Sequence, residues 1–257
     1  MKKKILITTG GSGGHVLPAI TIYDHLKVKY DVLISTDLRG HKYLDSDIYK
    51  VFVVNTPRLN KLILLPFAII KVFFLTLKSL FLLKREKIEI LISTGGYMSL
   101  PLCIAAKMRN IKIFLLEPNM IIGRANRFFL NFCEKIICYD SNVIGFPDKF
   151  QNKLKISHPL IRKKYFDINY KADVDRIFTI IIIGGSQGAK IFDEIVHESI
   201  LKISKIKPLK IIHQTNKKNI NFLKKFYTDN KIENIIFDFD ENLNVLLEQA
   251  DLCITRA

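Results

Sequence analysis

Glycine-rich turns follow short apolar runs at three places in the sequence: GGSGGH at 10–15, TGGY at 94–97 and GGSQG at 184–188. Glycine lets the backbone turn tightly and approach a ligand closely. A helix that begins after such a turn offers unpaired N–H groups and a partial positive charge, which suit phosphate. A repeated strand–glycine–helix turn therefore predicts parallel α/β sheets with ligands bound outside the carboxyl ends of the strands.

Short apolar runs alternate with longer helical stretches along the chain. The expected strands are 4–8, 32–35, 51–54, 88–93, 111–116, 135–138, 177–183, 209–213, 234–237 and 252–255. The expected helices are 14–28, 62–84, 97–109, 122–132, 187–204, 217–228 and 242–250. Near-continuous apolar strands between helices are typical of a parallel sheet covered on both faces. The periodicity fades over 141–176, so we expect two doubly wound domains, 1–157 and 158–257.

The chain is strongly basic, with a formal net charge of +16, and the first 145 residues carry 21 basic against 10 acidic side chains. Such an excess suggests an anionic partner: nucleic acid, an anionic membrane or a phosphate-bearing substrate. Biased codon usage in a Lys- and Ile-rich chain is the alternative. A hydrophobic fraction of 49% excludes a disordered chain. The four cysteines are too irregularly spaced for a disulfide framework or a zinc site, so we expect reduced thiols in a cytosolic protein.

Residues 62–85 form the most apolar segment. Its longest uncharged run is nine residues, and Lys71 and Lys78 interrupt the rest, so we expect that it does not span a membrane. On a helix, Lys71, Lys78 and Arg85 form one cationic stripe. An apolar face is offered by Leu62, Leu65, Ile69, Phe73, Leu77, Leu80 and Phe81. Such a helix suits the plane of an anionic bilayer; a partly buried crossover helix is the alternative.

Taken in order, several segments resemble the MurG family, the membrane-associated N-acetylglucosaminyltransferases of peptidoglycan synthesis. They are GGSGGH at 10–15, STGGYMSLP at 93–101, LEPNMIIGRAN at 116–126, GGSQGA at 184–189, HQT at 213–215 and ADLCITRA at 250–257. The resemblance implies a GT-B fold, in which two Rossmann-like domains face a cleft, the second being incomplete here. It implies an inverting transfer of GlcNAc from UDP-GlcNAc to the MurNAc 4-hydroxyl of lipid I, giving lipid II. It also implies no cofactor, no metal, and a peripheral position on the cytoplasmic face of the membrane.

The resemblance also assigns candidate residues. His15 matches a histidine near the reacting centre, and we take it as the candidate general base. The candidate substrate-binding residues are Ser12, Gly13 and Gly14 in the first turn, Asn119 and Arg162 for the UDP-sugar, and Ser186, Gln187 and Gly188 for the donor's phosphate or ribose. Two positions depart from the family. Its HEQN run reads Leu-Glu-Pro-Asn over 116–119, and its Asn-Pro before the arginine reads His158-Pro159, with one extra residue before Arg162.

The end of the sequence departs further. In the family, an arginine like Arg256 precedes a run with a glutamate that holds the ribose, and no such run is in this sequence. We expect these 257 residues alone not to transfer sugar at a useful rate; the codons after Ala257 are the cheapest check. Two alternatives stay open: a related GT-B transferase with another UDP-sugar and lipid acceptor, and a non-catalytic, truncated membrane-surface binding protein. We expect no nucleic-acid partner, because the aromatic residues cluster in the apolar helix rather than interleaving with basic ones.

Overall fold

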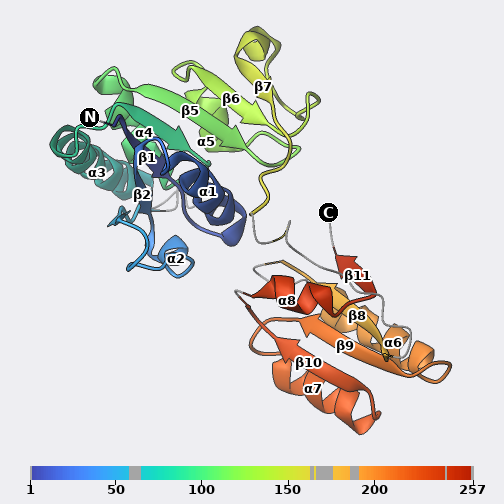
Figure 1. Cartoon of the computed structure of the whole chain (residues 1–257). Coiled ribbons are helices and arrows are strands. Elements are labelled where there is room, and N and C mark those ends of the chain that lie inside the picture. The colour runs from blue at the N-terminus through green and yellow to red at the C-terminus, as the bar shows by residue number, and fades with distance from the viewer. Residues whose placement is uncertain are drawn as a thin grey trace. The chain divides into compact units, whose positions relative to one another are not determined.

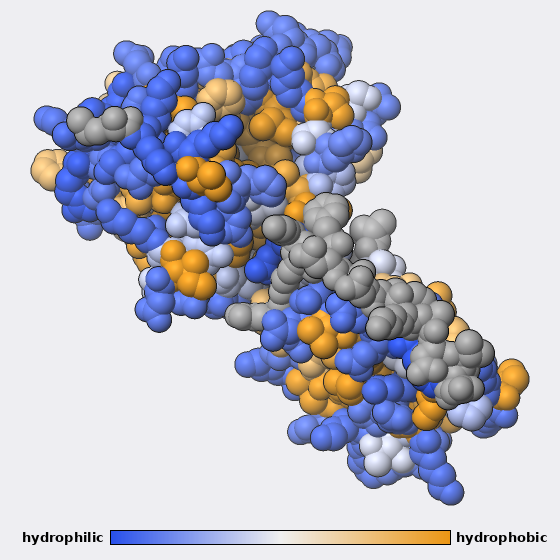
Figure 2. All heavy atoms as spheres, in the orientation of Figure 1, coloured by the Kyte–Doolittle hydropathy of each residue, from blue (hydrophilic) through white to orange (hydrophobic). Residues whose placement is uncertain are grey.

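The computed structural model describes residues 2–57, 65–162, 165, 176–185, 191–240 and 242–255. The chain divides into two compact units, Met1–Ile161 and Arg162–Ala257 (Figure 1). Each is described by itself. On the faces that Figure 2 shows, both units are mostly hydrophilic, with hydrophobic side chains in small groups.

The first unit contains a parallel sheet of seven strands in the order β3-β2-β1-β4-β5-β6-β7. The strands are β1 (Lys4–Thr8), β2 (Asp31–Thr36), β3 (Val51–Val53), β4 (Ile90–Ser93), β5 (Lys112–Glu117), β6 (Lys135–Cys138) and β7 (Leu154–Ile156). The strand order reverses between β1 and β4, which is where doubly wound sheets bind ligands. Strand β7 was not expected, because its three residues at the sheet edge are half-buried or exposed and form no apolar run.

The helices of the first unit are α1 (Gly13–Leu26), α2 (Leu38–His41), α3 (Leu65–Arg85), α4 (Ser99–Met108) and α5 (Arg124–Phe129), and a 3₁₀ helix covers Asp148–Lys153. Alternate strand residues face two different cores. Leu6 and its neighbours pack with residues of α3, α4 and α5, whereas Ile5 and Ile7 pack with α1. Burial on both faces explains why the strands read as continuous apolar runs. The single turn of α2 was not expected; the Asp37 carboxylate caps it by accepting a hydrogen bond from the Gly40 N–H at 2.9 Å.

Helix α3 buries one side and exposes the other. The buried side includes Ala68, Thr76, Ser79 and Leu83, and the helix packs against α4. The exposed side carries Phe67, Ile69, Ile70, Phe73, Phe74, Leu77 and Phe81. Among the described helices, Pro66–Arg85 is the one that is long and apolar enough to cross a membrane by length and composition, with a mean hydropathy of 1.9. We expected Lys71 and Lys78 to exclude a membrane span, but by composition they do not. The buried side of α3 makes it part of the helical layer of the first unit.

The second unit contains a parallel sheet of four strands in the order β10-β9-β8-β11. The strands are β8 (Phe178–Ile183), β9 (Leu209–Gln214), β10 (Glu233–Phe237) and β11 (Leu252–Thr255). A π-helical turn at Phe192–Val196 leads into α6 (His197–Ser204), and α7 (Ile220–Asp229) and α8 (Leu243–Glu248) follow. Ile180, Ile182, Ile211, Leu223 and Tyr227 form its core. Both units thus have the doubly wound architecture that the sequence predicts.

Candidate functional site

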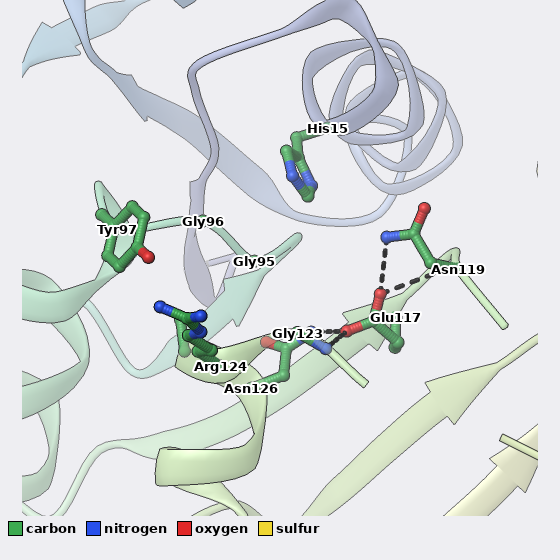
Figure 3. A pocket seen from close by; sticks show the side chains of 10 residues that line it. His15, Gly95, Gly96, Tyr97, Glu117, Asn119, Gly123, Arg124 and Asn126 are labelled. Carbon is green, nitrogen blue, oxygen red and sulfur yellow. Dashed lines mark hydrogen bonds between the residues drawn. The ribbon is translucent and has the colours of Figure 1, made fainter. Parts of the chain in front are cut away.

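A cavity of about 280 Å³ opens in the first unit, among the segments that follow β1, β4 and β5 (Figure 3). It is lined by His15, Gly95, Gly96, Tyr97, Glu117, Asn119, Gly123, Arg124, Ala125 and Asn126. These segments leave the carboxyl ends of strands on both sides of the point where the strand order reverses. The cavity therefore lies where a doubly wound sheet is expected to bind its ligand.

His15 projects from the first turn of α1 toward this cavity (Figure 3). Its Nδ1 lies 2.7 Å from the carbonyl oxygen of Thr94. Because a carbonyl oxygen only accepts hydrogen bonds, Nδ1 carries the proton in this contact. The neutral ring then has its lone pair on Nε2, which is the arrangement that a general base requires.

Glu117, the last residue of β5, is only 1% exposed. Its Oε1 accepts hydrogen bonds from the Asn119 N–H (3.2 Å) and the Asn119 Nδ2 (2.8 Å). Its Oε2 accepts from the Gly123 N–H (2.7 Å) and the Asn126 Nδ2 (3.0 Å). With four donors on its two oxygens, the carboxylate holds the 117–126 segment in place. Glu117 is thus a positioning residue for the floor of the cavity.

Asn126 lines the cavity with an unpaired acceptor. Its Nδ2 donates to the Leu116 carbonyl oxygen and to Glu117, both at 3.0 Å. Its Oδ1 is buried and has no hydrogen-bond partner within the described part of the chain. A buried acceptor without a partner is rare in proteins and indicates a place for a ligand donor or a water.

The first glycine turn is fixed by its contacts. A Cβ on Gly10 would lie 2.6 Å from the Met98 Cγ, and Gly11 has φ +85°. The Gly11 N–H donates to the Asp37 Oδ1 at 2.8 Å. Burial raises the pKa of the Asp37 carboxyl, but the hydrogen bonds from Gly11, Gly40 and Arg39 outweigh it, so the net pKa is lowered. The resulting anion anchors the turn that leads into α1.

The structure brings some of the predicted site residues together. His15 and Asn119 line the same cavity, and Ser12, Gly13 and Gly14 form the N-cap and first residues of α1 beside His15. Arg162 is half-buried at the start of the second unit and does not line this cavity. Ser186, Gln187, Gly188 and Arg256 lie outside the described residues. Just before them, Gly185 has φ +82° and donates its N–H to the Gln214 Oε1 at 3.1 Å.

Sequence reasoning missed Glu117, Asn126, Tyr97 and Arg124 as site residues. A signal was present for Glu117, since a carboxylate that ends a buried apolar strand needs hydrogen-bond donors near it. All four cysteines are free thiols, as expected. Within the described residues, no group of three or more His, Cys, Asp or Glu could hold a metal ion.

Comparison with known families gives two matches that together cover most of the chain. The glycosyltransferase family 28 N-terminal domain matches residues 5–138, and the family 28 C-terminal domain matches residues 179–257. The order of the two matches is that of the two units.

Individual relatives agree with these matches. The UDP-N-acetylglucosamine--N-acetylmuramyl-(pentapeptide) pyrophosphoryl-undecaprenol N-acetylglucosamine transferase of Pelagibacter ubique is 48% identical over 259 residues, which cover 100% of this chain and 72% of the relative. The protein with the same name in Rickettsia canadensis is 33% identical, covering 99% of this chain and 73% of the relative.

Solved structures agree in fold. Acinetobacter baumannii MurG superposes with a TM-score of 0.72 at 22% identity, covering 99% of this chain and 74% of that chain. The UDP-GlcNAc 2-epimerase of Neisseria meningitidis bound to UDP-GlcNAc has a TM-score of 0.66 at 12% identity, covering 99% and 77%. At these identities the likeness concerns the fold alone.

Two parallel α/β units, with a cavity at the switch point of the first, define a family 28 glycosyltransferase of the GT-B class. Within that class, the chain belongs to the MurG family of N-acetylglucosamine transferases. The fold class and the family expected from the sequence are thereby confirmed.

Proposed function

We propose that the reading frame containing these residues encodes an enzyme that transfers GlcNAc from UDP-GlcNAc to the MurNAc 4-hydroxyl of lipid I, forming lipid II. The observation that carries the proposal is the His15 ring, whose protonated Nδ1 is bound to the Thr94 carbonyl and whose Nε2 is left as a base beside the cavity. The names of the relatives support the substrates, since they specify an N-acetylmuramyl pyrophosphoryl-undecaprenol acceptor.

The acceptor is assigned to the cavity of the first unit. The MurNAc hydroxyl is placed at His15 Nε2, and a ligand donor satisfies the buried Asn126 Oδ1. Ser12, Gly13 and Gly14, at the N-terminus of α1, are assigned to substrate binding, because this helix end offers N–H groups and a partial positive charge to an anionic group.

As the family resemblance implies, Arg162, Ser186, Gln187 and Gly188 are assigned to the UDP-sugar donor. The resemblance also assigns Asn119 to the donor's sugar. As His15 takes the proton, the acceptor oxygen attacks the anomeric carbon from the face opposite the leaving group. The bond from that carbon to the diphosphate breaks, so UDP departs and the anomeric configuration inverts. The transition state is oxocarbenium-like, as in glycoside hydrolysis.

Helix α3 is assigned to the cytoplasmic face of an anionic membrane. Phe73, Phe74 and Phe81 are exposed, and Lys71 and Lys78 are exposed beside them. An apolar face flanked by cations inserts into the boundary between headgroups and acyl chains. One departure from the expected stripe is that Arg85 pairs with Glu86 at 3.1 Å, which reduces its free charge.

The test is transfer of labelled GlcNAc from UDP-GlcNAc to lipid I, measured on the longest open reading frame that contains these residues. Label should enter the lipid fraction, and unlabelled UDP-GlcNAc should compete better than UDP-GalNAc or UDP-glucose. Transfer from another UDP-sugar only, or to another lipid only, would replace this proposal with a related GT-B activity. Substrate binding without any transfer would support a non-catalytic role.

A further inference from the structure

A second, apolar groove of about 330 Å³ lies between α3, α4 and α5. It is lined by Ile69, Val72, Tyr97, Leu100, Ile104, Arg124, Ala125 and Phe128. Its size is in the range of small-molecule sites. The proposed transfer of sugar requires a polar cavity but does not by itself account for this groove.

The groove is continuous with the polar cavity. Tyr97, Arg124 and Ala125 line both of them. In Figure 3, Tyr97 and Arg124 lie on one side of the polar cavity, and Glu117 and Asn119 lie on the other. A ligand long enough to pass these shared residues would place a polar part beside His15 and an apolar part in the groove.

Charge at the junction selects the kind of ligand. Arg124 is the one charged residue among those that line the groove, and it is exposed. Within the described part of the chain, the Arg124 guanidinium makes no hydrogen bond or ion pair. A guanidinium with free donors binds phosphate oxygens in a bidentate manner. The order along the surface is therefore a polar cavity, a cation and then an apolar groove.

The outer end of the groove reaches the apolar face of α3. Ile69, which lines the groove, is 57% exposed and belongs to the same face as Phe73. A hydrocarbon chain that leaves a membrane at α3 can thus pass Ile69 and reach Arg124 without crossing polar surface.

We propose that this groove holds the first prenyl units of the lipid-linked acceptor, and that Arg124 binds the diphosphate to which they are attached. The proposal rests on the proposed function for the identity of the acceptor. It adds a binding subsite for the lipid itself, so that the enzyme recognises the tail as well as the sugar.

The subsite can be tested by binding, without donor or transfer. The dissociation constants of geranyl diphosphate, inorganic diphosphate and geraniol are measured by calorimetry in the absence of membranes. Geranyl diphosphate should bind at least about tenfold more tightly than either of the others, because burial of its hydrocarbon adds to the contact at Arg124. Equal affinities for geranyl diphosphate and inorganic diphosphate, or no binding of either, would overturn the proposal.

Two matched variants locate the site. Phe128→Glu places a charge at the groove, where Phe128 is 56% exposed, and should remove the advantage of geranyl diphosphate over inorganic diphosphate. Phe81→Glu changes an exposed phenylalanine of α3 outside the groove and should preserve that advantage. Equal losses in both variants would point to unspecific apolar adsorption and contradict the subsite.

A third variant tests the cation. Arg124→Gln should weaken the binding of geranyl diphosphate and of inorganic diphosphate by a similar factor.

A photoreactive prenyl diphosphate gives a check that does not depend on the folding of any variant. Cross-links should fall within residues 69–72, 97–104 and 124–128; labelling confined to the outer side of α3 would refute the groove. The outcome is separable from that of the transfer assay. Failure of transfer with intact prenyl selectivity would remove the proposed reaction, whereas transfer without prenyl selectivity would remove only the subsite.

Discussion

The Nδ1 of His15 lies 2.7 Å from the carbonyl oxygen of Thr94, and this contact leaves Nε2 as the basic nitrogen of the ring. If Nε2 takes the acceptor proton, His15→Ala should lower kcat by roughly 10²–10⁴-fold, the usual contribution of a general base. The KM for UDP-GlcNAc should change little. Steady-state transfer to lipid I measures both values.

His25 provides the matched control for that substitution. It lies in the same helix, and its Nδ1 contacts the Thr21 carbonyl oxygen at 2.9 Å, but it does not line the cavity. His25→Ala should therefore retain kcat. Normal turnover in His15→Ala, or equal losses in the two variants, would contradict the role of His15.

The four hydrogen bonds on Glu117 predict a second result. Glu117→Gln replaces one acceptor oxygen by an NH₂ group that faces donors, so the 117–126 segment should loosen. We expect the free energy of unfolding to fall by about 1–3 kcal/mol, and the KM for the acceptor to rise. Thermal unfolding and acceptor titrations provide the measurements. Glu134→Gln, at an exposed position, is the control; a Glu117→Gln protein that matches it in both measurements would show that the hydrogen bonds do not position the segment.

Charge reversal on α3 should weaken binding to anionic vesicles. Each basic residue near such a surface contributes about 1 kcal/mol, so Lys71→Glu with Lys78→Glu should reduce partitioning by more than about tenfold. Adding Arg85→Glu should have a smaller effect than either lysine change, because Arg85 already pairs with Glu86.

Vesicle flotation with anionic and zwitterionic lipids measures this partitioning. The control is Lys202→Glu with Lys224→Glu, which makes the same change in net charge on exposed helices of the second unit. If the control weakens binding as much as the α3 variant does, the attraction is a property of net charge rather than of α3.

His213 predicts a dependence of stability on pH in the second unit. Burial lowers the pKa of His213 to about 4; the Asp193 carboxylate opposes this shift and His197 adds to it. The unfolded chain has the ordinary histidine pKa and so binds the proton first as the pH falls. The free energy of unfolding therefore keeps its full value above about pH 6.5. It falls by about 3 kcal/mol as the pH is lowered toward 4.

Urea unfolding followed by circular dichroism between pH 7 and pH 4 checks this dependence. His213→Gln should flatten the profile of the second unit, while His25→Gln should leave it unchanged. An unchanged slope in His213→Gln would show that other groups cause the acid destabilisation.

Much of the fold could be predicted because the decisive signals are local. A run such as Lys4–Thr8 followed by glycines specifies a buried strand and a helix start within a dozen residues. The elements that were missed, α2 and β7, are short and carry no apolar period. Their formation depends on the Asp37 cap and on pairing with β6, respectively.

The site was harder to predict because its contacts join distant segments. His15 and Thr94 are 79 residues apart, and the meaning of Asn126 depends on how the chain turns back after Glu117. Asn119 was identified through the family resemblance, but its observed contact is with Glu117. Neither the period nor the spacing of residues encodes such a turn, so Glu117 and Asn126 become visible as site residues only once the loop is folded.

The outer side of α3 also has a consequence for handling the protein. Phe67, Phe73, Phe74 and Phe81 face solvent in the described structure, and water disfavours a contiguous apolar surface. In a detergent-free buffer, this surface is removed from water most favourably by contact with the same surface on another molecule. Sedimentation should therefore show reversible self-association that rises with salt, which screens the lysine repulsion, and that disappears when lipid is added. An oligomer found in lipid-free solution would thus be a substitute for the membrane rather than a subunit assembly.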